Sequence, residues 1–149
     1  MSVMTLCVSG QTPAKKPGEA VVLSAVSFKG EVKPGASVTA VVQFAVDKGF
    51  HVQANPASDD TYVAAALKLD PAVGVVAMPA KYPAGKEETV VGLDKPLKVY
   101  EGTFEVLIPL KLAADATLPI SINGVLTYQA CKGATCFPPR KLKVELKLK

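Results

Sequence analysis

The feature that most restricts the fold is a strict alternation of apolar and polar residues in several short stretches. In residues 141–149 every second residue is Leu or Val, and the others are Lys or Glu. Successive side chains of a β-strand point to opposite faces, so this pattern predicts a half-buried strand with a charged, solvated face. Residues 37–46 and 103–112 also place an apolar residue at every second position. The chain is therefore expected to be built from strands whose apolar faces share one core.

Shorter apolar stretches separated by turn signals recur along the rest of the chain. Lys33-Pro-Gly35 and Asp47-Lys-Gly49 are typical turn sequences. The stretch 79–96 has no periodic pattern and is expected to be irregular, and the three alanines within 62–69 leave a helical turn open there. The strands predicted are 20–28, 37–46, 50–54, 62–69, 73–78, 97–101, 103–112, 118–130 and 142–148.

Short strands spaced in this way favour an all-β fold, specifically an immunoglobulin-like antiparallel β-sandwich. A chain of 149 residues, 49% of them hydrophobic, suits one domain with a sizeable core. Because the chain lacks Trp and has no distant cysteines flanking one, the disulfide that joins the two sheets of antibody domains is not expected. Residues 1–18 show no pattern and are predicted to be a flexible lead-in to a domain at 19–149.

Composition and charge exclude several classes of function. The net charge is only +4 and the lysines are spread thinly, whereas nucleic-acid binding needs basic residues gathered on one face. A single histidine and the absence of a Gly-x-Ser-x-Gly motif argue against a hydrolase. No stretch approaches the roughly 18 to 20 apolar residues of a membrane span. We expect a monomeric domain that does not itself cross the membrane.

The beginning of the chain leaves its location open. The first ten residues are too short for a signal peptide and lack its basic start. The protein is therefore expected to be either cytosolic or a mature domain behind a start methionine. Whether it stands alone or is part of a larger membrane protein also stays open.

Two closely spaced cysteines, Cys131 and Cys136, lie between two predicted strands, at a hairpin tip or loop. Gly133 permits the positive φ that lets this loop fold back, so the two Cα atoms can approach to the roughly 4.4–6.8 Å of a disulfide. As a structural staple, so small a loop contributes only about 2 kcal/mol. As a redox site, an exposed disulfide is accessible to a partner's thiolate. The spacing alone leaves both readings equally open.

A metal site is not expected. Zinc generally takes four ligands, and only Cys7 and His51 remain to join the cysteine pair. Cys7 lies in the predicted lead-in, and His51 is interpreted as an ordinary strand histidine.

The sequence around the pair resembles a known active-site signature. Tyr128-Gln-Ala-Cys131, a short spacer and Cys136-Phe-Pro-Pro139 are similar to the N-terminal periplasmic domain of the membrane thiol:disulfide interchange reductase, the DsbD family. A looser similarity covers residues 20–148 and includes Lys48-Gly-Phe-His51 and Val99-Tyr-Glu-Gly102. The four-residue spacer is one shorter than in the best-known members.

The resemblance implies a periplasmic protein-disulfide reductase module, a thiol-disulfide oxidoreductase without a cofactor. Such a domain accepts electrons from a membrane-embedded reductase domain and passes them to oxidised thioredoxin-like periplasmic proteins. Cys136 then forms the mixed disulfide with the partner, and Cys131 resolves it. The alternative is a non-catalytic immunoglobulin-like binding domain with a structural disulfide.

Three neighbours are candidate supporting residues. Tyr128 packs either beneath the cysteine loop or simply in the core. Phe137 presents an apolar contact to a docking partner or is a buried anchor. The charge of Lys132, next to Cys131, favours a thiolate there.

Members of this family shield the pair with a cap loop that carries an aromatic residue. Here the corresponding stretch is 86–95, which offers Val90, Val91 and Leu93 but no aromatic. Glu87 and Glu88 at its start either raise the pKa of a nearby thiol or are ordinary solvated acids.

Overall fold

The computed structural model describes residues 16–149, and all of their regular secondary structure is β-strand. Cys7 and most of the predicted lead-in lie outside the described residues. The described part of the chain has no helix with the length and hydropathy of a membrane span. The strands are β1 (Val21–Lys29), β2 (Ser37–Val46), β3 (His51–Gln53), β4 (Ala66–Leu69), β5 (Val75–Ala77), β6 (Lys86–Glu88), β7 (Leu97–Tyr100), β8 (Thr103–Leu112), β9 (Ile120–Tyr128), β10 (Ala130–Lys132), β11 (Thr135–Cys136) and β12 (Arg140–Leu148).

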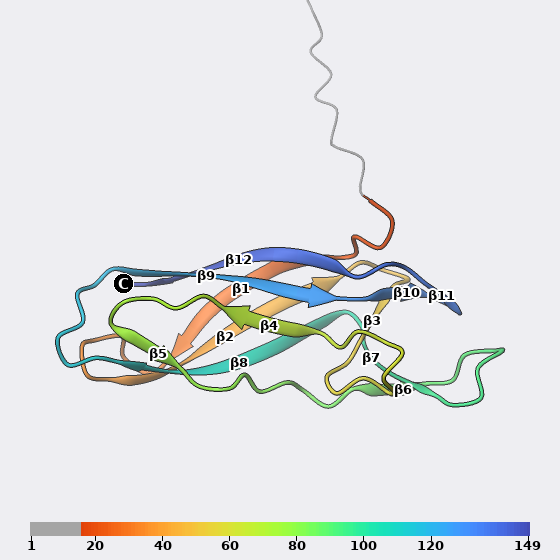
Figure 1. Cartoon of the computed structure of the whole chain (residues 1–149), viewed down its shortest axis with the longest axis horizontal. Coiled ribbons are helices and arrows are strands. Elements are labelled where there is room, and N and C mark those ends of the chain that lie inside the picture. The colour runs from red at the N-terminus through yellow and green to blue at the C-terminus, as the bar shows by residue number, and fades with distance from the viewer. Residues whose placement is uncertain (1–15) are drawn as a thin grey trace, which may run out of the picture.

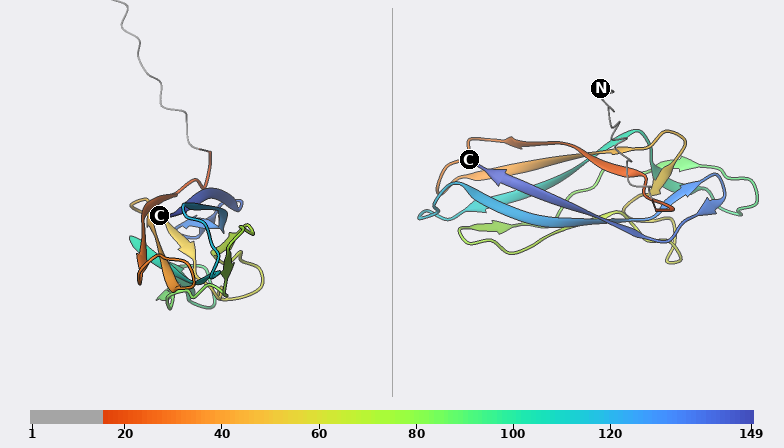
Figure 2. Two further views of the ribbon diagram at one scale, coloured as in Figure 1. Left: turned by 90° about the vertical axis from the view of Figure 1, so that its left-hand side faces the viewer. Right: turned by 90° about the horizontal axis from the view of Figure 1, so that it is seen from above.

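These strands form two long antiparallel layers, which confirms the predicted β-sandwich. One layer has the strand order β1-β2-β8-β5 and the other β12-β9-β4. Figures 1 and 2 show the two layers running along the length of the molecule. The apolar side chains of their strands form the main core.

The core between the layers is formed by the alternating residues that the sequence predicts. In β2 the buried side chains include every second residue from Val38 to Val46, and β8 does the same from Phe104 to Leu112. In β12 the leucines and Val144 face inward while the lysines are exposed. The ring of Phe104 packs between Phe44 and Tyr100, at centroid distances of 5.3 and 4.6 Å.

A third sheet, built from five short strands, lies at one end of the sandwich and has the order β11-β10-β3-β7-β6. Its strands continue those of the long layers: β3 follows β2 after a turn, β7 leads into β8, and β10 follows β9 after a single residue, Gln129. The end sheet therefore collects segments from both layers. It also carries both cysteines of the predicted redox pair, in β10 and β11.

Three predicted elements differ from the structure. Lys86–Glu88 is a strand within the stretch predicted to be irregular, because it pairs with the edge of β7. Only the last four residues of 62–69 are strand, preceded by a turn at Asp59–Tyr62. The long strand predicted over 118–130 is broken at Gln129, since the chain passes there from one sheet to the next.

Candidate functional site

The two cysteines are directly paired across the β10–β11 hairpin and form a disulfide. Their Cα atoms are 4.0 Å apart, and the turn between the strands includes Gly133 at a φ of 58°. Positive φ is costly for residues with a Cβ, so the glycine allows this tight return. The hairpin thus brings together the two residues that the sequence marked as the site.

The two sulfur-bearing residues differ in accessibility. Cys131 is fully buried, whereas Cys136 is only partly buried. The reason is their place in the sheet: β10 is an inner strand between β11 and β3, and β11 is the edge. The sequence-based picture of an exposed disulfide therefore applies to Cys136 alone.

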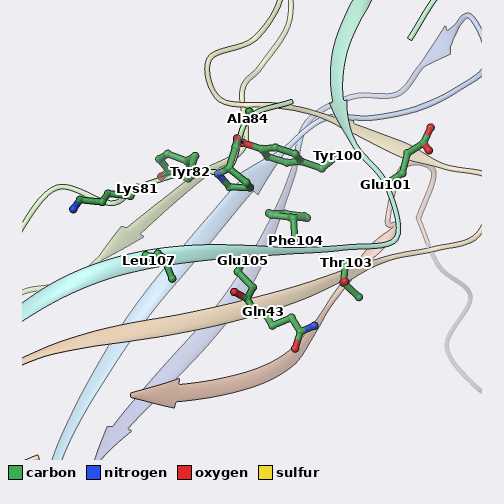
Figure 3. A pocket seen from close by; sticks show the side chains of 11 residues that line it. Gln43, Lys81, Tyr82, Ala84, Tyr100, Glu101, Thr103, Phe104, Glu105 and Leu107 are labelled. Carbon is green, nitrogen blue, oxygen red and sulfur yellow. Dashed lines mark hydrogen bonds between the residues drawn. The ribbon is translucent and has the colours of Figure 1, made fainter. Parts of the chain in front are cut away.

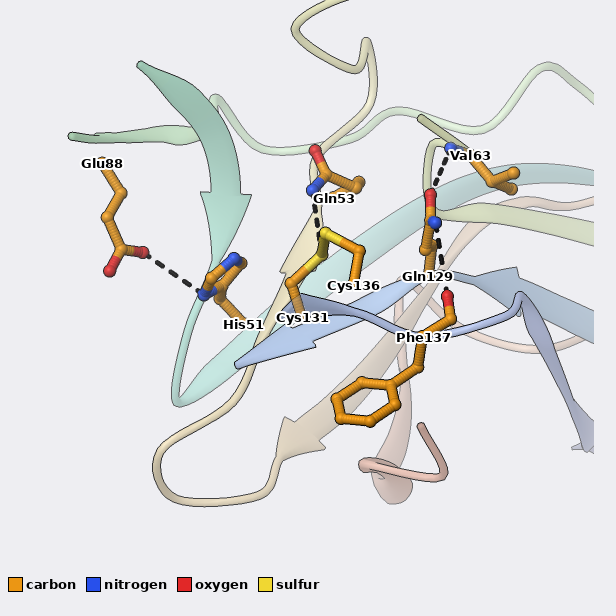
Figure 4. Close-up of a disulfide and its surroundings, with 8 residues drawn as sticks. All are labelled: His51, Gln53, Val63, Glu88, Gln129, Cys131, Cys136 and Phe137. Atoms are coloured by element: carbon orange, nitrogen blue, oxygen red, sulfur yellow. Dashed lines mark hydrogen bonds and ion pairs between the residues drawn. A yellow bond between two sulfur atoms is a disulfide. The ribbon is translucent and has the colours of Figure 1, made fainter. Parts of the chain in front are cut away.

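Gln53 contacts the buried sulfur and was not identified from the sequence. Its side chain is completely buried, and its Nε2 donates a hydrogen bond to Cys131 Sγ at 3.5 Å (Figure 4). Gln53 lies two residues after His51 in β3, so both side chains are on the same face of the sheet. The sequence shows a glutamine within the predicted strand 50–54, but it does not show that this side chain is buried or what it contacts.

His51 is the direct cross-strand neighbour of Cys131. Its side chain is 3% exposed, and its Nδ1 lies 3.4 Å from Glu88 Oε2, in the first strand of the predicted cap region. The other ring nitrogen, Nε2, is buried without a hydrogen-bond partner. Figure 4 shows the imidazole between Glu88 and the disulfide. The sequence interpretation of His51 as an ordinary strand residue missed this position.

A cavity of about 360 Å³ opens beside this histidine, lined among others by His51, Glu88, Glu101 and Gly133. Ligand atoms of the three titratable residues lie within 4.8 Å of one another. A hydrogen bond between the side chains of Glu88 and Glu101 holds the pKa of Glu101 below its ordinary value; Lys86 and His51 act in the same direction, and burial opposes them. Because Lys86 Nζ lies 3.4 Å from Glu101 and the imidazole of His51 lies next to Glu88, we interpret the cluster as a polar network that contains one ion pair, Lys86–Glu101.

The opposite face of the end sheet carries Lys132 and the aromatic residues. The ammonium of Lys132 lies 5.4 Å from the centroid of the Phe50 ring, and the ring of Phe137 lies 6.0 Å from the same ring. Neighbouring residues in a strand point to opposite faces, so Lys132 and Cys131 point apart although they are adjacent in sequence. The structure places Phe137 in a partly buried aromatic contact.

Tyr128 and Gln129 fix the chain on either side of the strand break. Tyr128 is 2% exposed and belongs to the main core, and burial raises its pKa. Gln129 accepts a hydrogen bond from the amide of Val63 at 2.8 Å and donates one to the carbonyl of Phe137 at 3.3 Å. Gln129 therefore ties the segment after Cys136 to the neighbouring loop.

The predicted cap stretch, 86–95, begins with β6 and ends just before β7. Val90 is buried, and with Leu97 and Val99 it forms a small apolar cluster against which Leu93 and Tyr62 pack. Val91 is 95% exposed. The stretch has no aromatic of its own, but Tyr62 supplies one from a distant part of the sequence.

The cavity in Figure 3 lies apart from the cysteines, over β8 and the neighbouring loop, and has a volume of about 530 Å³. Tyr100, one of its lining residues, donates a hydrogen bond from its hydroxyl to the Pro83 carbonyl at 2.7 Å. That hydroxyl is thus occupied in holding the loop. Nothing in this cavity resembles a nucleophile paired with a base.

Comparison with protein families gives one match. The model of the N-terminal part of the thiol:disulfide interchange protein DsbD matches residues 19–148, nearly the whole described chain. No curated protein sequence matches.

Solved structures share the fold at low sequence identity. The N-terminal domain of DsbD from Neisseria meningitidis, in the reduced form, is 21% identical with a TM-score of 0.50, and 89% of each chain is covered. The N-terminal periplasmic domain of ScsB from Proteus mirabilis is 16% identical with a TM-score of 0.58, covering 91% of this chain and 49% of that one. The yeast GGA1 GAE domain is 7% identical with a TM-score of 0.51, covering 90% and 96%. The predicted immunoglobulin-like sandwich is confirmed.

Proposed function

This chain belongs to the family of N-terminal domains of the thiol:disulfide interchange protein DsbD, and on that basis we propose that it exchanges disulfides with partner proteins through Cys131 and Cys136. The observation that carries the proposal is the disulfide at the edge of the end sheet, with Cys136 partly accessible and Cys131 buried. Exchange begins with the attack of a thiolate on a sulfur that it can reach.

The unequal burial of the two cysteines supports different roles for them. In the reduced domain, the Cys136 thiolate attacks a partner's disulfide and forms a mixed disulfide, releasing one partner thiolate. Cys131 then attacks Cys136 Sγ, which closes the internal disulfide and releases the partner's second sulfur. Two electrons pass to the partner, and the two sulfurs released take up two protons.

We further propose that the partners are thioredoxin-like proteins of the periplasm and that a membrane-embedded reductase domain regenerates the dithiol. This direction of electron flow is what family membership suggests. Cap residues Val90 and Leu93 pack on the end sheet and are suited to limit access to the pair. Phe137 and Phe50 offer an apolar contact on its other face.

Trapping of the mixed disulfide tests the roles of the cysteines. With Cys131→Ser, Cys136 is expected to form a stable mixed disulfide with an oxidised thioredoxin-like protein, because the resolving thiol is gone. Cys136→Ser is the matched control and should trap none, provided that Cys7 is replaced by serine in both variants. Covalent adducts are counted by mass spectrometry under non-reducing conditions. Equal trapping by both variants would contradict the assignment.

The reduction potential separates exchange from a structural role. Redox titration against a glutathione or dithiothreitol series should place the pair above about −300 mV, the region of exchanging disulfides. A value well below that would assign Cys131–Cys136 to a structural staple and the domain to a binding role.

A further inference from the structure

We propose that His51, oriented by Glu88, is the base that removes the proton of the Cys131 thiol. This inference rests on the proposed function, and it concerns only the second, resolving step of the exchange. It starts from a difficulty that the structure presents: the thiol that must become a thiolate is completely buried. Burial in apolar surroundings raises the pKa of a thiol, and solvent has no direct access to it.

The β-sheet register places one titratable residue directly opposite Cys131. His51 in β3 is paired with Cys131 in β10. Side chains of directly opposed residues in an antiparallel sheet share one face, with Cβ atoms about 4.5–5.5 Å apart. The hydrogen bond from Gln53 to Cys131 Sγ at 3.5 Å confirms which face this is, since Gln53 and His51 alternate to the same side of β3.

The imidazole lies between the carboxyl group of Glu88 and the disulfide (Figure 4). Its Nδ1 is 3.4 Å from Glu88 Oε2, a close polar contact that is not a formed hydrogen bond, and its Nε2 is buried without a partner. In the tautomer whose proton is on Nδ1, next to Glu88, Nε2 has a free lone pair. Proteins activate thiols and hydroxyls by placing a base next to the nucleophile and a third group that orients the base. Lys132, although adjacent in sequence, cannot take this part because its ammonium lies over Phe50 on the opposite face.

A path for the proton leads away from His51. The cavity of about 360 Å³ reaches His51, Glu88 and Glu101 and is also lined by Asp47 and Lys48. Glu101 is paired with Lys86 at its outer side. These are the charged groups that face the histidine from the turn before β3, from β6 and from the end of β7. Cys131 gives its proton to His51 Nε2, and the cluster of His51, Glu88 and Glu101 then releases a proton to solvent through the cavity.

In the resolving step one S–H bond and one S–S bond break, and one S–S bond forms. The Cys131 S–H bond breaks and its proton passes to Nε2. The thiolate forms a bond to Cys136 Sγ, and the bond between Cys136 and the partner breaks. The partner's sulfur leaves with the electron pair and is protonated from solvent, while His51 returns to its neutral form.

The test separates the two steps of exchange in the full chain. Reduced protein is mixed with oxidised glutathione, the reaction is quenched with acid at intervals, and the glutathione adduct and the internal disulfide are quantified by mass spectrometry. For His51→Gln we expect adduct formation at Cys136 to be unchanged and its resolution to be about a hundredfold slower at pH 7, the lower range for general acid–base catalysis. Metal chelator is present throughout.

The pH profile distinguishes a base from a structural residue. The resolution rate of His51→Gln should keep rising with pH and approach that of the wild type at alkaline pH, where Cys131 ionises unaided. Glu88→Gln should show a smaller loss with the same trend. Lys143→Gln, at an exposed lysine of β12 outside this cavity, is the control and should follow the wild type.

Two results would overturn the proposal: resolution by His51→Gln at the wild-type rate at pH 7, or a loss by the same factor at every pH. Thermal unfolding of the oxidised variants checks that they are folded. If His51→Gln does not fold, the pH dependence of the resolution rate is measured on Glu88→Gln instead. A wild-type protein that forms no glutathione adduct would instead contradict the proposed function and leave no step for His51 to serve.

Discussion

Tyr128 and Tyr100 are buried phenols at the end of the sandwich that carries the cysteines, and burial raises the pKa of both. Backbone groups of Ala20 and Val21 that hydrogen-bond to Tyr128 oppose the shift without cancelling it. The folded state therefore favours the neutral phenols. A group whose folded pKa is raised contributes stability that is complete below its unfolded pKa, here 10.0, and is lost as the pH rises through the folded value.

Tyr128→Phe is accordingly expected to lose stability at neutral pH but to be less sensitive to alkali. Removing the hydroxyl and its backbone contacts should cost about 0.5–1.5 kcal/mol at pH 7. Above pH 10 the difference from the wild type should shrink, because the variant has no phenol to ionise at this position. Urea unfolding between pH 7 and pH 11 measures both effects, and parallel stability curves would contradict the explanation.

At the scale of single residues, the sequence predicts functional residues where they lie close together in a short motif. Cys131, Cys136, Tyr128 and Phe137 were found in this way. The sequence assigns no functional role to His51, because its two neighbours in space, Glu88 and Cys131, are distant in the chain. Cross-strand neighbours depend on register, and register in a short end strand such as β3 is not encoded by any local pattern.

At the scale of elements, β9 depends on a glycine that no turn requires. Gly124 lies between β4 and β12, and a Cβ there would be 2.7 Å from Leu69 Cδ2 and 2.9 Å from the carbonyl oxygen of Lys68. The leucine side chain is able to move, but the carbonyl belongs to the strand backbone. The glycine therefore lets three strands approach closely at this point.

Gly124→Ala is expected to destabilise the domain by about 1–3 kcal/mol, the usual cost of inserting a carbon into a packed site. Asn123→Ala, exposed in the same strand, is the matched control and should change stability by less than about 0.5 kcal/mol. Denaturant unfolding of both variants provides the comparison. Equal stability of the two variants would contradict the expectation that a Cβ at position 124 destabilises the domain.

The long strands were predictable because each buries one face for nine or ten residues, as β2, β8 and β12 do. In the end sheet, β3 and β7 fall within the predicted strands 50–54 and 97–101, whereas β6 and β11 were not predicted, since strands of three and two residues are too short to show a period. β6 is composed of three charged residues, and only its pairing with β7 makes it a strand. The break at Gln129 was hidden because apolar alternation continues across it.

At the scale of the whole molecule, the disulfide and the core are separate. The main core fills the space between the two long layers and extends to Val52, Tyr100 and Ala130 of the end sheet, but it does not include Cys131. The hairpin that carries the pair belongs to the end sheet. A cluster of twenty-five buried residues thus holds the sandwich together without any contribution from the disulfide.

Reduction should therefore leave the domain folded. The cysteines are separated by five positions, and closing so small a loop restricts the unfolded chain by only about 2 kcal/mol. We expect the free energy of unfolding to fall by roughly that amount in reductant, with the cooperativity of the transition retained. Urea unfolding with and without a phosphine reductant measures the difference, and the double variant Cys131→Ala/Cys136→Ala serves as a control that cannot re-form the bond.

Loss of the cooperative transition on reduction would show that the bond holds the fold, which is the behaviour of a structural staple. Persistence of the fold has the opposite consequence. An exchange module must present the same docking surface as dithiol and as disulfide, because the disulfide receives electrons and the dithiol delivers them. A sandwich whose stability lies between its long layers, with the reactive hairpin at one end, meets that requirement, since the chemistry at Cys136 then changes few of the contacts that maintain the fold.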